Sequence, residues 1–159
     1  MKRRQMLFAG LGVVATAAAV GSLGRSAMAA PDMTVFKGPW CACCTGWIGH
    51  VEAAGYRVRA VDVEETGVVK ARLGVPPGLA SCHTAEVGGY VVEGHVPAAA
   101  IERLLAGRPA IAGLAVPGMP TGSPGMEVAG AEPDTYDVIA FGPDGSERVF
   151  MSFRGGVPV

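Results

Sequence analysis

Residues 33–54, MTVFKGPWCACCTGWIGHVEAA, carry the strongest structural signals in the chain. The run 33–36 favours a β-strand, and residues 37–40, which include Gly and Pro, favour a loop. A helix is predicted from about Cys43 to Ala54, because apolar residues recur at i, i+4 and i+7 from Trp47 and a glycine follows. The segment therefore predicts a strand, a loop and a helix whose N-terminus carries most of the cysteines of the chain.

Three of the four cysteines lie within four positions, Cys41-Ala42-Cys43-Cys44, and the fourth forms the dipeptide Cys82-His83. Bridged cysteines need Cα atoms roughly 4.4–6.8 Å apart, so adjacent Cys43 and Cys44 cannot form an unstrained bond. One long-range bridge to Cys82 would leave two thiols over, which argues against a set of ordinary structural disulfides. Crowded thiolates suit Cu(I), Zn(II) or iron–sulfur centres. The sulfurs therefore hold metal, exchange disulfides, or do both.

The spacing of Cys41 and Cys44 is that of a C-x-x-C motif at a helix N-terminus, where backbone N–H groups and the helix dipole stabilise thiolates. This motif is typical either of a redox pair or of half a metal site. Cys43 favours the metal site, because a third thiol beside a catalytic pair invites mispairing, whereas a cluster can use every sulfur. Cysteines buried as small apolar residues are the less favoured alternative.

The rest of the chain up to the third helix alternates strand and helix patterns. The predicted elements are a strand at Tyr56–Val63, a helix at Thr66–Leu73, extended runs at Leu79–Val87 and Tyr90–Val92, and a helix opened by Pro97. Gly88-Gly89 between the extended runs indicates a hairpin. The order β-α-β-α-β-β-α is that of the thioredoxin/glutaredoxin core. In such a core the loop before the hairpin packs against the loop after the first strand, so we expect Cys82-His83 to lie near Cys41–Cys44.

The segment Leu114–Val128 is rich in Gly, Pro and Met and is predicted to contain neither helix nor strand, as an ordered loop or lid. Tyr136–Phe141 and Glu147–Phe153 then predict a C-terminal β-hairpin. Met119 and Met126 lie in the loop. Their thioethers are soft donors that suit Cu(I), although methionine more commonly fills gaps in a core.

The three histidines have different expectations. His83 could ligate a metal through an imidazole nitrogen, orient a sulfur from outside the ligand shell, or lie exposed in a loop. His50 is expected to be structural or exposed. His95 precedes the third helix, where a capping role is favoured over a peripheral ligand.

Residues 1–30 are predicted to be an export signal, cleaved near Ala29/Ala30. Lys2–Arg4 form a positive n-region, and the apolar, alanine-rich run Met6–Val20 follows it. The Arg3-Arg4 pair fits a twin-arginine signal as well as an ordinary Sec signal. Such a signal predicts a periplasmic protein, in an oxidising compartment where free thiols persist only when metal or a reductant protects them.

Residues 31–159 are predicted to form one domain, large enough to bury a core without disulfides. The signal holds four of the 13 basic residues and none of the 14 acidic ones, which leaves a net charge of −5. No basic stripe exists, so nucleic-acid binding is excluded. A weakly anionic field attracts cations. Stable membrane insertion after signal removal is not expected.

Several motifs together resemble one known family. They are Cys41–Cys44 before Trp47, Lys70–Pro77, Ser81–Thr84, Val92–Pro97, Val116–Pro120 and Gly122–Met126. They are similar to the CopG-like family of exported, thioredoxin-like copper-resistance proteins, which is distinct from the DNA-binding repressor of the same name. The resemblance spans nearly the whole chain after residue 30. It implies a thioredoxin-like fold and a cysteine-bridged copper cluster held by Cys41, Cys43, Cys44 and Cys82.

Two function classes follow. The first is a periplasmic copper-binding protein for copper resistance or homeostasis, with a multinuclear Cu(I) thiolate cluster, His83 as a further ligand, and Met119 and Met126 as outer donors. Copper redox cycling and contact with other periplasmic copper-handling proteins are compatible with it. The alternative is a thiol–disulfide oxidoreductase that uses Cys41 and Cys44. The sequence favours binding and leaves an enzymatic role, as a copper or thiol oxidoreductase, open.

Overall fold

The computed structural model describes residues 31–159, and the predicted export signal lies outside the described residues. The strands are β1 (Asp32–Lys37), β2 (Arg57–Asp62), β3 (His83–Val87), β4 (Tyr90–Glu93), β5 (Gly113–Ala115), β6 (Thr135–Phe141), β7 (Glu147–Arg154) and β8 (Val157–Pro158). The helices are α1 (Ala42–Ala53), α2 (Thr66–Arg72) and α3 (Ala98–Gly107), with a short 3₁₀ helix, η1 (Pro77–Leu79). The predicted order β-α-β-α-β-β-α is therefore present, with η1 inserted before β3.

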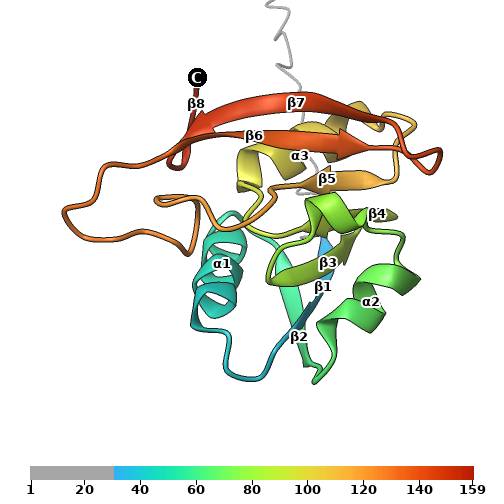
Figure 1. The fold of residues 1–159 in the computed structure, drawn as a ribbon, viewed down its shortest axis with the longest axis horizontal. Coiled ribbons are helices and arrows are strands. Elements are labelled where there is room, and N and C mark those ends of the chain that lie inside the picture. Colours follow the sequence, from blue (N-terminus) through green and yellow to red (C-terminus); the bar gives the residue numbers. More distant parts are fainter. Residues whose placement is uncertain (1–30) are drawn as a thin grey trace, which may run out of the picture.

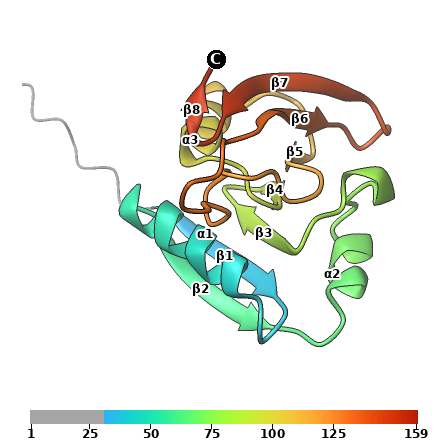
Figure 2. The same ribbon diagram turned by 60° about the vertical axis from the view of Figure 1, so that its left-hand side comes forward.

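All strands form one mixed sheet in the order β2-β1-β3-β4-β5-β6-β7-β8 (Figure 1). β1 pairs parallel with β2 and antiparallel with β3, and β4 pairs antiparallel with β3. β5 runs parallel to β4 and joins this half of the sheet to the antiparallel strands β6 to β8. The C-terminal β6–β7 hairpin is thus an extension of the same sheet, as the two views show (Figures 1 and 2).

The two faces of the sheet bury different sets of side chains. Trp47 of α1 and Ile101 of α3 pack with Val92 of β4 in the main core. The neighbouring residue of β4, Val91, faces the other way, toward a smaller cluster around Leu79 of η1. This alternation is what a strand buried on both faces requires. The face that carries α1 and α3 is the one that bears the cysteines.

Helix α1 follows the prediction closely. It begins after Cys41, whose carbonyl accepts the Thr45 N–H, and it ends one residue before the predicted end. Trp47 and Val51 are fully buried, as their spacing predicts, whereas Ala54, the third position of the predicted apolar face, is exposed at the end of the helix. Gly55 has φ of 97°, the left-handed conformation that lets the chain leave a helix at low cost.

The β3–β4 hairpin is confirmed. Gly88 and Gly89 both have positive φ, 57° and 87°, which is the requirement of a type I′ turn between two strands. The extended run expected before it is shorter than predicted, because residues up to Leu79 form η1 and β3 begins only at His83. Cys82 consequently lies at the end of a loop, immediately before the sheet.

The prediction that Leu114–Val128 contains no strand is wrong at its beginning. Gly113–Ala115 form β5, paired on both sides. A strand of three residues has too little periodicity to detect. Gly113 is needed there because a Cβ would collide with the Val91 carbonyl and with the ring of Phe141.

Residues 116–134, here called the long loop, have no helix or strand and are held by their own turns, as expected. One example is the Gly122 N–H, which donates to the Met126 carbonyl at 2.8 Å. The C-terminal hairpin is confirmed as β6 and β7, with β8 added beyond it. Within residues 31–159, no helix has both the length and the apolar character needed to cross a membrane.

Candidate metal centre

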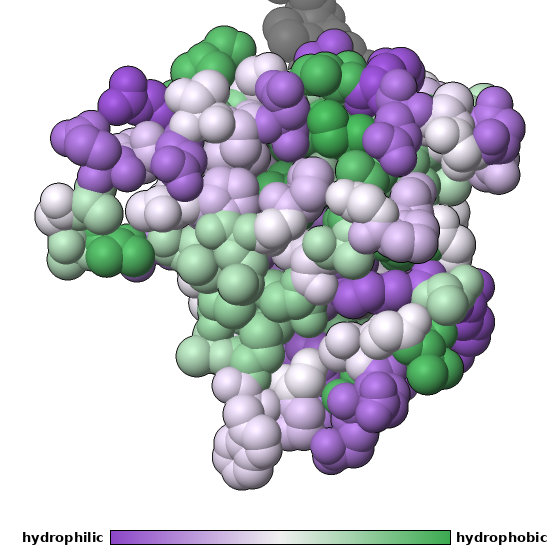
Figure 3. Space-filling model, in the orientation of Figure 1, coloured by the Kyte–Doolittle hydropathy of each residue, from purple (hydrophilic) through white to green (hydrophobic). Residues whose placement is uncertain are grey.

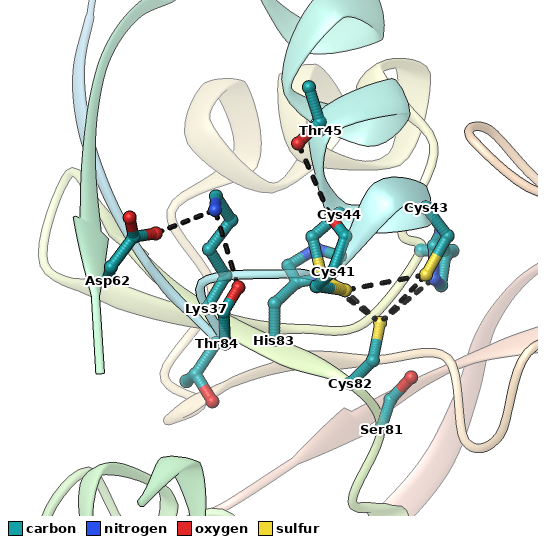
Figure 4. The surroundings of a disulfide bond; sticks show 12 residues. Lys37, Cys41, Cys43, Cys44, Thr45, Asp62, Ser81, Cys82, His83 and Thr84 are labelled. Carbon is teal, nitrogen blue, oxygen red and sulfur yellow. Dashed lines mark hydrogen bonds and ion pairs between the residues drawn. A yellow bond between two sulfur atoms is a disulfide. The ribbon is translucent and has the colours of Figure 1, made fainter. Parts of the chain in front are cut away.

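The four cysteine sulfurs meet at one end of the sheet, within 4.8 Å of one another (Figure 4). Cys82 Sγ lies 3.6 Å from Cys44 Sγ and 3.8 Å from Cys43 Sγ. The cause is the pairing of β1 with β3, in which Lys37 faces His83. The end of β1 and the start of β3 are therefore neighbours, and the predicted approach of Cys82 to the C-x-C-C motif is confirmed.

Two of the sulfurs are bonded to each other. Cys41 and Cys44 form a disulfide across three positions, whereas Cys43 and Cys82 are free. The bond is local and leaves the two remaining thiols beside it, with Cys43 Sγ 3.5 Å from Cys41 Sγ. Reduction of this disulfide adds two electrons and two protons and would present four thiols to a single site.

Cys82 is half-buried, and burial together with the neighbouring Cys43 thiol raises the pKa of Cys82 to about 12. Cys82 therefore keeps its proton at neutral pH and is a poor spontaneous nucleophile. A soft cation can displace that proton, because thiolate is the form that ligates metal. The raised pKa of Cys82 therefore disfavours spontaneous attack, and metal binding at Cys82 must release the thiol proton.

His83 is fully buried, so the exposed-loop alternative is wrong. Its Nδ1 lies 3.2 Å from Cys82 Sγ, and its ring lies 4.4 Å from the Trp47 ring, centroid to centroid. Burial lowers its pKa to about 3, with smaller contributions from His95 and Lys70. His83 is neutral, and its buried Nε2 has no hydrogen-bond partner among the described residues.

His95 is the residue whose importance sequence reasoning missed. Its Nε2 lies 3.1 Å from Cys82 Sγ, and its Nδ1 lies 2.8 Å from the Pro124 carbonyl. Because a carbonyl only accepts, Nδ1 carries the proton and Nε2 turns its lone pair toward the sulfur. Cys82, His83 and His95 form a second group of donors within 4.8 Å. His50 is structural as expected, since its Nε2 accepts the Ala98 N–H at 3.0 Å.

A signal for His95 was present in the hairpin. Thr84 pairs with Glu93 in the β3–β4 register. Extending that register by two residues places Cys82 opposite His95. The Gly88-Gly89 turn can be predicted from the sequence, and the strand register that this turn fixes places His95 beside Cys82.

The two methionines differ in their surroundings. Met119 is 53% exposed, and Met126 is half-buried. Met126 follows Gly125, which packs so closely on α1 that a Cβ there would lie 2.6 Å from the Cys43 carbonyl oxygen. The long loop is thus docked on the cysteine-bearing turn, and Figure 3 shows a weakly hydrophobic surface over this region. Neither methionine is placed as a ligand by these contacts.

The fold and the site define a mixed α/β protein with a cysteine-rich site of the metal-binding kind. Two solved structures of the copper resistance protein copG are similar to it. Form 2 is 42% identical with a TM-score of 0.74, and form 1 is 43% identical with a TM-score of 0.73. Each match covers 78% of this chain and 98% of the solved chain. The chain therefore belongs to the CopG family.

A family model described as "Protein of unknown function, DUF411" matches residues 79–126. The matched segment contains Cys82, His83 and His95 as well as most of the long loop. No protein with curated annotation matches the sequence.

Proposed function

We propose that this protein binds copper as Cu(I) through Cys41, Cys43, Cys44 and Cys82, in the service of copper resistance or homeostasis. The carrying observation is the convergence of four sulfurs within 4.8 Å in a chain 42% identical to a copper resistance protein. Thiolates are the ligands that Cu(I) prefers.

The proposed site holds more than one ion. Four thiolates around a single Cu(I) would leave donors unused, whereas bridging sulfurs let neighbouring ions share them. His83 and His95 complete the site on the Cys82 side, where both rings reach the sulfur. The hydrogen bond from His95 Nδ1 to a carbonyl is the kind of outer contact that orients a metal-binding imidazole.

We further propose that residues 31–159 are a thioredoxin-like domain, extended by the long loop and the C-terminal hairpin. The order β2-β1-β3-β4, with β1 and β2 parallel and a helix beginning at the C-x-x-C motif, supports this assignment.

The third part of the proposal is that residues 1–30 direct export of the protein to the periplasm. It rests on the sequence of that segment, and the periplasm is an oxidising compartment in which the Cys41–Cys44 disulfide is compatible with the surroundings.

Reduction should control copper loading. With Cys41 and Cys44 bonded, only Cys43 and Cys82 offer thiols, so the oxidised protein should take up fewer Cu(I) ions than protein treated with a phosphine reductant. Anaerobic titration against a chromogenic Cu(I) chelator measures both capacities. Reoxidation of the reduced sample should restore the lower value. Equal capacities before and after reduction would count against a site built from all four sulfurs.

The alternative function, thiol–disulfide exchange, is favoured by one observation, the disulfide between Cys41 and Cys44. We nevertheless expect weak insulin-reductase activity from the metal-free protein. Cys43 lies 3.5 Å from Cys41 and should trap intermediates, and the pKa of Cys82 is too high for it to attack readily. Turnover comparable with a glutaredoxin, abolished by Cys41→Ser, would favour the oxidoreductase instead.

The long loop is proposed to cover the bound copper, with Met119 and Met126 as soft outer donors. Replacing both methionines with leucine keeps the apolar volume and removes the thioethers. The double variant should fold normally and release copper faster to a competing chelator. Because Met119 is exposed and Met126 half-buried, the single variants show which residue contributes. An unchanged release rate would assign both side chains to packing.

A further inference from the structure

A buried ion pair lies next to residues 81–84, here called the Cys82 segment. Lys70 of α2 reaches across to Glu93 at the end of β4, with 2.7 Å between Nζ and Oε1. The Glu93 side chain is fully buried, and that of Lys70 is only 11% exposed. Neither group belongs to the cluster of sulfurs and imidazoles described above.

Both oxygens of the Glu93 carboxylate hold the chain on either side of Cys82. Oε1 accepts the backbone N–H of Ser81 at 2.6 Å, and Oε2 accepts the Thr84 hydroxyl at 2.7 Å. Lys70 Nζ also donates to the Thr84 hydroxyl oxygen at 3.1 Å. Figure 4 shows Ser81 and Thr84 on the two sides of Cys82 and His83. One carboxylate therefore fixes the residue before Cys82 and the residue after His83.

The residue after Glu93 closes the same contact. The Gly94 N–H donates to the His83 carbonyl at 2.9 Å. Gly94 has φ of 71°, and a Cβ there would lie 2.6 Å from the Ser81 side chain. The end of β4 thus packs directly against residues 81–84 without an intervening side chain. This close packing lets the Glu93 carboxylate reach the Ser81 N–H and the Thr84 hydroxyl.

Stability is a poor explanation for this pair. Removing two charges from water is costly, and replacing a buried ion pair by apolar residues of similar size is commonly neutral or stabilising. A buried pair that is nevertheless built into the fold is better explained by what it holds in place. Here that is the one cysteine supplied from outside the C-x-C-C turn.

We propose that Glu93, neutralised by Lys70 and assisted by Thr84, is a positioning residue that holds Cys82 at the distance needed to join the other three sulfurs. This inference rests on the proposed copper-binding function. It assigns Glu93 no contact with the metal and makes the carboxylate act through the Ser81 N–H and the Thr84 hydroxyl.

Two paired substitutions separate positioning from charge. The double variant Lys70→Met with Glu93→Leu, here called the leucine pair, removes the charges and the acceptors together. The double variant Lys70→Met with Glu93→Gln, here called the glutamine pair, also removes the charges, but it keeps an amide oxygen for the Ser81 N–H. Loss of an outer-shell partner typically costs about 10- to 100-fold in metal affinity. We expect at least about a tenfold loss of Cu(I) affinity in the leucine pair and rescue to within about threefold in the glutamine pair.

The metal-free protein provides a second measurement. Hydrogen exchange at the Ser81 amide should be faster in the reduced leucine pair and unchanged in the reduced glutamine pair. Tyr90→Phe is the matched control, because it breaks a side-chain hydrogen bond to the Pro109 carbonyl at the end of β4 that lies opposite Glu93. It should leave copper affinity unchanged.

A double-mutant cycle with Cys82→Ser makes the test decisive. If Glu93 acts through Cys82, the leucine pair should weaken copper binding no further in the serine background. Additive losses, or wild-type affinity in the leucine pair, would overturn the proposal. Should the leucine pair not fold, Thr84→Val decides, with a several-fold loss supporting positioning and unchanged affinity refuting it. If the wild type binds no copper, the proposed function fails, and the exchange comparison still tests whether Glu93 fixes this segment.

Discussion

Replacing Cys82 with serine is expected to weaken Cu(I) binding as severely as replacing Cys44. Cys82 Sγ lies within 3.8 Å of both Cys43 Sγ and Cys44 Sγ, so its sulfur closes the cluster from the side opposite α1. A serine hydroxyl is a hard donor of low affinity for Cu(I). We expect a loss on the order of 100-fold or more, above the range typical of outer-shell residues.

The comparison needs both variants in reduced form, measured against the same Cu(I) chelator. Circular dichroism should show that Cys82→Ser keeps the fold, since Cys82 lies in a half-buried loop. The same check is required for Cys44→Ser, because Cys44 is fully buried in α1. Ser146→Ala, in the distant β6–β7 turn, is a control for loss of a side-chain hydrogen bond. Wild-type copper number and affinity in Cys82→Ser would refute both the site and the role of the β1–β3 pairing in assembling it.

Replacing Trp47 with alanine is expected to cost about 3–5 kcal/mol of unfolding free energy, the range for truncating a buried aromatic residue. The Trp47 side chain is fully buried, and its Nε1–H donates to the Val96 carbonyl at 2.9 Å. Its ring also packs on His83. Trp47 therefore joins the cysteine-bearing helix to the segment that carries the site histidines.

Denaturant unfolding of the reduced, metal-free protein measures this cost. Trp40→Ala is the matched control, because that side chain is 96% exposed and its loss should leave the unfolding midpoint unchanged. Copper affinity should fall with Trp47→Ala as well, since the helix and His83 lose their common support. Coincident unfolding curves for Trp47→Ala and the wild type would show that the ring contributes little to holding the site.

Local signals explain why much of this fold was predictable. The Gly88-Gly89 pair indicates a hairpin turn, and the spacing of Trp47 and Val51 indicates a buried helix face. Both elements could therefore be predicted from neighbouring residues alone. β5 could not be found this way, because its three residues become a strand only through partners from β4 and β6. Gly113 is required because a side chain would not fit between β4 and β6, and this requirement cannot be seen in the local sequence.

The site residues likewise differ in how far the sequence alone predicts their position. The C-x-C-C turn is contiguous in sequence, and topology alone brought Cys82 to it. His95 needed the strand register, and the Glu93 contacts needed the position of α2 relative to β4. The pairing of Cys41 with Cys44 could not be fixed from residue types, because the same motif serves redox chemistry and metal binding alike.

The proposed copper cluster, held by four cysteine sulfurs together, can be tested by native mass spectrometry of the reduced protein loaded anaerobically with Cu(I). The measured quantity is the number of copper ions per chain after removal of loosely bound metal with a weak chelator. We expect more than one ion per chain, because four thiolates within 4.8 Å can bridge neighbouring ions. One ion or none per chain would contradict the proposed cluster.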